Sequence, residues 1–329
     1  MHKYKLSIVI AMYNIGSYIR YCLESCIRQN GVGESDYEII VVNDGSTDGS
    51  LAIAEECAGS AGNIRIISQD NAGLSCARNT GLKNALGEYV WFVDGDDAIS
   101  GDAVRLILAN IAAHPADAYI CNFSTFSTGD LQQTSHFKSY NNLSGEEIHE
   151  KYLHILPMMA WLTIYRTDCL RRHALEFMPG IYHEDLEFSV RAHHCMDSIY
   201  FIEESLYHYR VARADSIMNK AGKDNTRSLQ SEIAIIDSFS AFFGTRQTAF
   251  VKKVLGVCAT DFLVKYYGSS SAPSEAAVRL YRDNKRRLNR MMWQSGRWKM
   301  RALLLATVLL PAPLRAKVYA YAGSKAKLM

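Results

Sequence analysis

The chain has 329 residues, of which 48% are apolar and 21% charged. This balance is ordinary for a folded protein and excludes a mainly disordered chain, and the length suits one large domain with an appendage or two ordinary domains. The net charge of +2 conceals an asymmetry, because residues 279–329 hold thirteen Lys or Arg and one acidic residue, whereas residues 1–278 hold 23 Lys or Arg against 33 Asp or Glu.

The first 120 residues alternate between short apolar runs and helical patterns. Strands are predicted at Leu6–Met12, Tyr37–Val42, Ile64–Ser68, Tyr89–Val93 and Ala118–Phe123, and helices at Ser17–Gln29, Gly49–Cys57, Leu74–Leu86 and Asp102–Ala113. This alternation predicts βαβ units, and hence a mostly parallel sheet with helices on both faces. Ligands of such sheets bind beyond the carboxyl ends of the strands.

The rest of the chain is less regular. Residues 124–150 are polar and are predicted to form a loop. Further strands are predicted at Trp161–Tyr165, Ile199–Ile202 and Leu206–Arg210, with a helix at His183–Cys195. The pattern is helical from about Thr226 to the last residue. No run reaches the eighteen or so apolar residues of a membrane span, and the apolar run that starts at Leu6 is typical of a buried strand rather than of a signal peptide.

Polar residues follow three of the predicted strands. Tyr13 and Asn14 follow the first strand, Asn43-Asp44-Gly45-Ser46 the second, and Asp94-Gly95-Asp96-Asp97 the fourth. Parallel strands end at one edge of a sheet, so these groups are expected to share a rim. For Asp44 the alternative is a helix-capping turn, and its functional role would be to accept hydrogen bonds from a uracil-like base or a ribose.

The acidic sequence Asp94-Gly95-Asp96-Asp97 favours a cation. Three carboxylates within four residues repel one another unless a positive charge neutralises them, and hard oxygen ligands suit Mg²⁺ or Mn²⁺ bridging to a diphosphate. The alternative is a solvated acidic turn. An EF-hand is disfavoured because its ligand spacing and closing Glu are missing.

Two further segments open predicted helices. The sequence Asn71-Ala72-Gly73-Leu74-Ser75 leads to Arg78, which could reach a nucleotide or its phosphates, since helix N-termini favour anions. The sequence His183-Glu184-Asp185 places carboxylates at a helix start, which is also a routine dipole-stabilising choice. No GxGxxG or GxxxxGK[ST] sequence is present, and the eight scattered cysteines contain no CxxC pair, so we expect a reducing cytosol.

Taken together, these segments resemble the inverting family 2 glycosyltransferases of GT-A fold, in particular bacterial surface-polysaccharide transferases. The resemblance rests on residues 7–14, 42–48, 71–81 and 92–97 in register. It is dense over about residues 5–125 and thinner through His183-Glu184-Asp185, Tyr207-His208-Tyr209-Arg210, Arg213 and Ser216. It implies a catalytic domain over residues 1–220, with a nucleotide-sugar half to about 125 and an acceptor half after it. Residues 221–329 would form a helical C-terminal region.

The resemblance also implies roles. Tyr13 and Asp44 would hold the nucleoside of the donor, with Arg78 nearby, and Asp94 and Asp96 would form the metal and diphosphate site. Asp185 would be the general base. The resemblance further suggests that Arg213 and Ser216 close over the diphosphate, and that Trp161 and Glu184 face the acceptor.

The implied enzyme transfers a hexosyl or N-acetylhexosaminyl group from a nucleotide sugar, UDP-linked in our expectation, with Mn²⁺ or Mg²⁺. The acceptor is expected to be a glycan or lipid-linked glycan of a capsule, exopolysaccharide or lipopolysaccharide. On chemistry alone a retaining enzyme stays open. A sugar-nucleotide pyrophosphorylase, a basic-tailed nucleic-acid-binding protein and an inactive scaffold are the alternatives; the first lacks its Gly- and Arg-rich loop, and the acidic body argues against nucleic acid.

The basic tail predicts a partner by its charge rather than by resemblance. Residues 279–301 carry nine of the thirteen basic residues, interleaved with Trp293 and Trp298, and an apolar run too short to span a bilayer follows. Basic flanks with Trp are typical of a helix lying in a membrane interface. We therefore expect peripheral attachment at the inner face of the cell membrane; the alternative is a helical pair packed on the catalytic domain with a solvated basic face.

Overall fold

The computed structural model describes residues 2–127, 131–133, 143–152, 158–211, 225–246, 248–269 and 272–326. The chain divides into two compact units. The first comprises Met1–Ile148, Pro157–Gly180 and Glu184–Arg213, and the second His149–Leu156, Ile181–His183 and Ala214–Met329. The boundary predicted near residue 220 falls within 212–224, outside the described residues.

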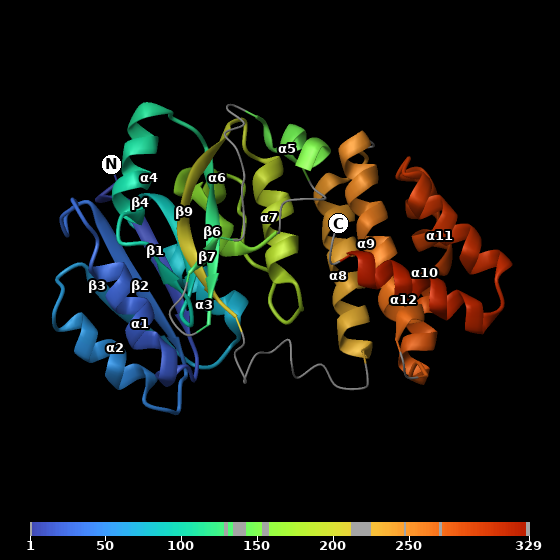
Figure 1. The fold of residues 1–329 in the computed structure, drawn as a ribbon, viewed down its shortest axis with the longest axis horizontal. Helices are drawn as coiled ribbons and strands as arrows, with labels where there is room; N and C mark the ends of the chain where they lie inside the picture. The colour runs from blue at the N-terminus through green and yellow to red at the C-terminus, as the bar shows by residue number, and fades with distance from the viewer. Residues whose placement is uncertain are drawn as a thin grey trace. The chain divides into compact units, whose positions relative to one another are not determined.

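The first unit is built on one mixed sheet (Figure 1). Its strands follow the order β3-β2-β1-β4-β8-β6-β9-β5, with β7 beside β6. Strands β1 to β4, β6 and β9 run in one direction, and β5, β7 and β8 run in the other. The strand bounds are β1 Tyr4–Met12, β2 Tyr37–Asp44, β3 Ile64–Gln69, β4 Gly87–Asp94, β5 Ala98–Ile99, β6 Ala118–Phe126, β7 Gln132–Gln133, β8 Thr163–Arg166 and β9 Ile199–Arg210.

Helices connect these strands and pack on the sheet. Their bounds are α1 Gly16–Ile27, α2 Ser50–Ala58, α3 Leu74–Asn84, α4 Ala103–Ala113, α5 Gly145–Tyr152, the 3-10 turn Ala160–Leu162, α6 Thr167–Arg172 and α7 Glu184–His194. Helix α3 packs against β1 and β2, and α2 against β3. Gly81 of α3 allows this close approach, because a Cβ there would lie 2.1 Å from a methyl carbon of Val9.

The core forms where apolar strands are covered on both sides. All eight residues of β2 are buried, and Trp91 and Phe92 of β4 are buried on opposite faces of the sheet. A parallel strand between two neighbours needs this apolar continuity, since helices cover both of its faces. The central strands are therefore rigid supports for the residues that follow them.

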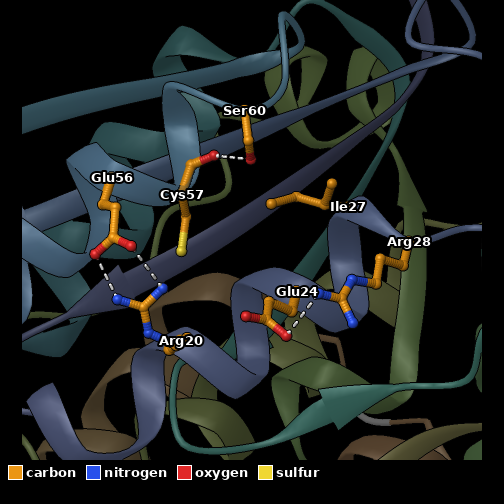
Figure 2. A pocket seen from close by; sticks show the side chains of 7 residues that line it. All are labelled: Arg20, Glu24, Ile27, Arg28, Glu56, Cys57 and Ser60. Atoms are coloured by element: carbon orange, nitrogen blue, oxygen red, sulfur yellow. Dashed lines mark hydrogen bonds and ion pairs between the residues drawn. The ribbon is translucent and has the colours of Figure 1, made fainter.

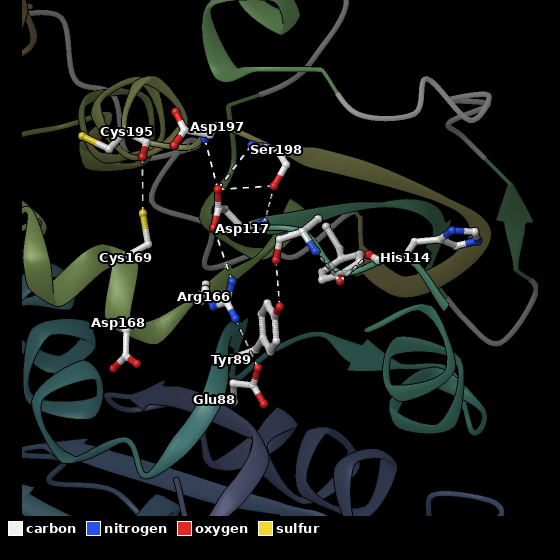
Figure 3. A network of polar contacts seen from close by, with 12 residues as sticks. Glu88, Tyr89, His114, Asp117, Arg166, Asp168, Cys169, Cys195, Asp197 and Ser198 are labelled. Carbon is white, nitrogen blue, oxygen red and sulfur yellow. Dashed lines mark hydrogen bonds and ion pairs between the residues drawn. The ribbon is translucent and has the colours of Figure 1, made fainter. Parts of the chain in front are cut away.

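A polar network joins the strands at the end of the sheet where β4 and β6 begin (Figure 3). Asp117 accepts hydrogen bonds from the backbone N–H groups of Asp197 and Ser198 at 3.1 and 3.3 Å. Arg166 lies 3.6 Å from both Asp117 and Glu88. These contacts hold β4, β6, β8 and the start of β9 together at one end of the sheet. The predicted polar rim lies at the opposite end, where β1, β2 and β4 finish.

The second unit is helical. Its helices are α8 Thr226–Phe243, α9 Ala249–Gly268, α10 Glu275–Gln294, α11 Trp298–Leu309 and α12 Ala312–Ala326. Helix α9 is central, because α8, α10 and α12 all pack on it. The hydroxyls of Thr248 and Ser274 cap α9 and α10 by accepting from backbone N–H groups three residues on. Within the described ranges, no helix combines the length and the apolar character needed to cross a bilayer.

The predicted α/β fold with a helical C-terminal region is confirmed, with local corrections. The loop predicted over 124–150 is wrong at its end, where α5 begins with a capping box in which Ser144 and Glu147 bond each other's backbone N–H. The two short strands predicted at 199–202 and 206–210 form the single strand β9, whose pairing with β6 shifts register near Asn122. The strand predicted at Trp161–Tyr165 begins as a 3-10 turn and continues as β8.

Candidate active site

The predicted polar rim exists at the edge where β1, β2 and β4 end. In the sheet register Ala11 of β1 lies opposite Asp94 of β4, and Met12 lies opposite Asn43 of β2. Tyr13, the next residue along the chain, is 49% exposed. The strand order therefore brings the three predicted polar segments to one edge.

Asp44 organises the start of α3. Its Oδ1 accepts from the Ala72 N–H at 2.9 Å and from the Gln69 side chain at 2.7 Å, and its Oδ2 accepts from the Gly73 N–H at 2.8 Å. The carboxylate is buried. Next to it, Gly45 has a φ of +72°, and a Cβ there would lie 2.9 Å from the backbone nitrogen of Asn71. The hydrogen bonds of Asp44 therefore stabilise the 71–73 loop. The predicted contact with a nucleoside would be made beside these bonds.

Arg78 of α3 lies at the centre of an acidic cluster. Its guanidinium donates through Nη2 to Asp94 Oδ1 at 2.7 Å, and through Nη1 to Asp185 Oδ1 at 2.5 Å and Glu184 Oε1 at 3.1 Å. The Arg78 side chain is only 2% exposed and lies over the ring of Phe177. The fold therefore brings together four predicted site residues that are up to 107 positions apart in the chain.

Helix α3 also fixes the segment that leads to these carboxylates. Asn79 exchanges two hydrogen bonds with the backbone of Phe177, both of 2.8 Å, and Ser75 donates to the carbonyl of Met178 at 2.9 Å. Thr80 on the same helix donates to Gln69, which in turn holds Asp44. The sequence segment 71–81 is therefore a bridge between the two predicted halves of the site.

Burial and neighbouring charges shift the pKa values of the groups in this cluster. Burial alone would lower the pKa of Arg78, but the charges of Asp185, Asp94 and Glu184 outweigh it and raise that pKa. Burial raises the pKa of Asp94, against the effect of Arg78. Burial and the neighbouring Asp185 raise the pKa of Glu184 to about 7. Three carboxylates surround one buried guanidinium, so negative charge is in surplus in this cluster.

Strand β9 holds the acidic turn after β4 by hydrogen bonds. The Tyr207 hydroxyl donates to Asp97 Oδ2 at 2.6 Å and accepts from the Asp94 N–H at 3.2 Å. The N–H of Arg210 donates to Asp97 Oδ1 at 2.7 Å, and its Nε donates to the carbonyl of Asp96 at the same distance. Burial, together with Asp94 and Asp96, raises the pKa of Asp97 well above its usual range. These bonds, the β9 clamp, fix the backbone that presents Asp94 and Asp96.

The predicted metal ligands Asp94 and Asp96 supply hard carboxylate oxygens, the donors that Mg²⁺ and Mn²⁺ prefer, and their role stays a prediction. Asp94 engages Arg78 through Oδ1, and its side chain keeps 28% of its surface exposed. Within the described residues, no group of three or more His, Cys, Asp or Glu is arranged as a metal cage. A Mg²⁺ or Mn²⁺ site that takes one or two carboxylates and completes its shell with substrate phosphates and water needs no such cage.

Trp161 is not one of the residues that contact Arg78, and it lies against Tyr207 instead. Trp161 is buried, stacked on Tyr207 with ring centroids 4.2 Å apart, and its burial weighs against direct contact with an acceptor. Arg213 and Ser216 lie outside the described residues. The predicted roles all stay predictions, namely those of Tyr13, Asp44, Arg78, Asp94, Asp96, Trp161, Glu184 and Asp185. The burial of Arg78 favours positioning over contact with the donor.

A surface hollow between α1 and α2 is a separate feature (Figure 2). Its two cations are already paired, Arg20 with Glu56 at 2.5 Å and Arg28 with Glu24 at 3.2 Å. None of the predicted site residues lines it. Because its charges neutralise one another, the hollow offers little to a diphosphate.

Tyr207 and Arg210 received no role from the sequence. The signal was present, because Tyr207-His208-Tyr209-Arg210 is among the segments that carry the resemblance, but the pattern does not say which side chains face the acidic turn. The pairing of β9 with β6 and β5 determines this. The site therefore contains a support that only the fold reveals.

These features are those of an α/β enzyme whose carboxylates gather at the carboxyl ends of the parallel strands of a mixed sheet. The model of the family Glycosyl transferase family 2 matches residues 7–173. "Putative glycosyltransferase EpsH" of Bacillus subtilis is 34% identical over 243 residues, which cover 72% of this chain and 68% of EpsH. The chain belongs to glycosyl transferase family 2, as the sequence motifs predicted.

Solved structures agree on the fold. TarS of Staphylococcus aureus, a poly(ribitol-phosphate) beta-N-acetylglucosaminyltransferase, is 28% identical over 220 residues. Its crystal structure with UDP-GlcNAc has a TM-score of 0.68 and 20% identity, and the match covers 96% of this chain and 89% of that one. Mannosyltransferase PcManGT from Pyrobaculum calidifontis, in complex with GDP-Man and Mn²⁺, has a TM-score of 0.56 and 14% identity over 99% of this chain and 88% of that one. The predicted GT-A-like fold is confirmed.

The matched segment is a variable share of the curated relatives. It covers 68%, 31%, 66% and 60% of the length of four of them. The relatives therefore support the family and its glycosyl transfer, and the substrates are a matter for proposal.

Proposed function

We propose that the protein is a metal-dependent inverting glycosyltransferase. It would move a hexosyl or N-acetylhexosaminyl group from a UDP-sugar to the hydroxyl of a glycan or lipid-linked glycan, in the synthesis of a bacterial capsule, exopolysaccharide or lipopolysaccharide. The observation that carries the proposal is the Arg78 cluster, which joins the acidic turn after β4 to the carboxylates that open α7. The bacterial relatives support glycosyl transfer, and the UDP-GlcNAc bound by TarS supports a UDP-linked donor.

Asp185 is the general base of this proposal. The acceptor oxygen attacks the anomeric carbon, the bond from that carbon to the diphosphate oxygen breaks, and its electron pair leaves with the diphosphate. The acceptor proton goes to Asp185. Inversion follows from this single in-line displacement, so no covalent nucleophile is required. The hydrogen bond from Arg78 fixes the position of the Asp185 carboxylate before the acceptor binds.

The donor would lie along the rim where β1, β2 and β4 end. Tyr13 offers an exposed ring just after β1, and Asp44 ends the neighbouring strand β2, a pair of positions that suits a nucleoside. Asp94 and Asp96 would hold Mn²⁺ or Mg²⁺, which when bound neutralises charge on the departing diphosphate. Arg213 and Ser216 are proposed to close over that group. Glu184, beside Asp185, is proposed to face the acceptor, and the buried Trp161 is proposed to shape the acceptor side through Tyr207 without direct contact.

One donor screen tests the proposal. The protein is incubated with UDP-, GDP- and dTDP-sugars, with Mn²⁺ or with EDTA, and the nucleotide products are separated by chromatography. The expected result is release of UDP from a UDP-hexose or UDP-N-acetylhexosamine that depends on Mn²⁺. Formation of UTP and a sugar 1-phosphate when pyrophosphate is added would instead identify a pyrophosphorylase, and turnover of no nucleotide sugar would contradict glycosyl transfer.

We also propose that transfer takes place at the cytoplasmic face of the cell membrane. The free cysteines suit a reducing compartment. A lipid-linked acceptor would be presented at that surface.

A further inference from the structure

Helix α10 carries a row of cations on one side. Arg279, Arg282, Arg286 and Arg290, the basic ridge, are three or four residues apart and all exposed, which places them on one face of the helix. The opposite face is buried through Ala277, Tyr281, Leu288 and Met292. Two acidic residues lie beside the ridge: Asp283 is 3.9 Å from Arg279 and 3.6 Å from Arg282, and the exposed Glu275 lines a surface hollow with the same two arginines. Four cations against two carboxylates leave the ridge with a net positive charge.

Helix α11 exposes large apolar side chains. Trp298, Leu305 and Leu309, the apolar stripe, are spaced seven and four residues apart and therefore share one face. Trp298 is 74% exposed and Leu309 is 72% exposed. The helix buries Met300 and Leu304 elsewhere, so its packing within the unit does not explain the stripe. Apolar side chains grouped in this way on a surface mark an interaction site.

The ridge and the stripe adjoin. Trp293, half exposed at the end of α10, accepts a hydrogen bond at its carbonyl from Arg301 Nε at 3.1 Å. The guanidinium of Arg301 also lies 5.1 Å from the ring centroid of Trp293. Arg301 is on α11, three residues after Trp298. The two helices therefore present cations, indole rings and leucines as one continuous surface.

We infer that this surface, the docking face, binds an anionic lipid bilayer with α10 and α11 lying in the interface. Cations meet lipid phosphates, the Trp rings sit at headgroup level, and the leucines enter the acyl boundary. Nucleic acid would use the basic ridge, but it offers no apolar phase for Leu305 and Leu309. The inference rests on the proposed function in one respect, because it accounts for how the enzyme reaches a lipid-linked acceptor.

Vesicle co-sedimentation of the full-length protein tests the docking face. The vesicles are phosphatidylcholine alone or with 40% phosphatidylglycerol, in about 0.1 M and about 0.5 M NaCl, a range over which exposed charges become largely screened. One variant replaces the basic ridge with Gln, and a second carries Leu305→Ser and Leu309→Ser. The matched control replaces four exposed cations of the first unit, Lys3, Arg28, Lys83 and Arg172, with Gln. Circular dichroism checks that each variant is folded.

The unchanged protein is expected to pellet with the anionic vesicles only and to be released by high salt. The ridge variant should bind them at least 10-fold more weakly, the stripe variant several-fold more weakly, and the control variant as well as the unchanged protein. Equal binding to both vesicle types, no binding at all, or an equal loss in the control would overturn the inference. Binding of duplex DNA by the unchanged protein without vesicle binding would do the same. UDP release from a soluble UDP-sugar should be equal in all variants, which separates failure of the docking face from failure of the proposed function.

Discussion

Asp96 belongs to the Asp94/Asp96 pair that we propose as the metal site, and Asp94 of that pair also engages Arg78. We expect Asp96→Ala to abolish transfer and to weaken Mn²⁺-dependent binding of UDP, measured by calorimetry, while the fold is kept. Asp70→Ala, at an exposed position, is the control and should be neutral. Full activity of Asp96→Ala together with full activity in EDTA would exclude the metal assignment.

Asp185 and Arg78 form the shortest contact of the cluster, so substitution at this position must keep a hydrogen-bond acceptor for the guanidinium. Asp185→Asn does so while removing the base. The expected result is a fall in kcat of about 10²-fold or more, with the donor Kd nearly unchanged. An equal loss of donor affinity would assign Asp185 to the donor site instead.

Glu184 should make the enzyme sensitive to pH near neutrality. Its pKa is raised to about 7 by burial and by Asp185, so it is neutral below that pH and anionic above it. Ionised Glu184 adds negative charge beside the place where the acceptor proton is taken up, and kcat/KM should therefore rise between pH 6 and 8. Glu184→Gln should remove that inflection and keep activity. An inactive Glu184→Gln would make Glu184 itself the base.

Stability should change in the opposite direction over a lower range. A carboxyl whose pKa is higher in the folded state binds more protons there than in the unfolded chain, so its contribution to stability is present below the unfolded pKa and is lost as pH rises through the folded one. For Glu184 that window runs from about 4.5 to about 7. The Tm of Glu184→Gln should therefore fall less steeply with pH across this window than the Tm of the unchanged protein.

At the scale of elements, strand β9 supports the acidic turn through its side chains. Tyr207→Phe removes a donor to Asp97 and an acceptor for the Asp94 N–H. Hydrogen bonds to charged groups contribute about 1.5–3 kcal/mol, so Mn²⁺-dependent UDP binding should weaken by about 10-fold or more, with a smaller effect on kcat. Tyr209→Phe is the control, because its ring also stacks on Trp161. If both variants bind UDP equally, the β9 clamp does not position the metal site.

The contrast between α3 and β9 explains what could be read from the sequence. The segment 71–81 follows a predicted strand and opens a helix, so its place at the rim follows from local pattern alone. The partners of Arg78 do not, because Asp94 and Asp185 meet only after β8 and α6 return the chain to β4. The roles of Tyr207 and Arg210 depend on a register shift in β9 that no periodicity reveals. Local signals thus predicted the rim, and tertiary contacts completed the site.

At the scale of the whole molecule, the chain passes from one unit to the other next to its proposed base. Residues 181–183 belong to the helical unit and Glu184 to the sheet unit. His183 adopts a left-handed φ of 63°, which is unusual for a residue other than glycine. Within the helical unit its Nε2 accepts from Lys265 Nζ at 2.9 Å, and Lys265 also pairs with the buried Glu232. The residue just before the Glu184-Asp185 pair is therefore held by Lys265 of α9, which the buried Glu232 of α8 fixes in place.

Lys265→Met should consequently affect both stability and turnover. Glu232 would be left buried without its cation, which costs about 3–5 kcal/mol and should lower the Tm. Release of His183 would loosen the start of α7, so kcat should fall several-fold while the KM for the donor stays nearly unchanged. Lys265→Arg should restore much of both, and Lys252→Met, on the same helix, should change neither. A lowered Tm with unaltered kcat would mean that Lys265 supports the helical unit alone and does not position the proposed base.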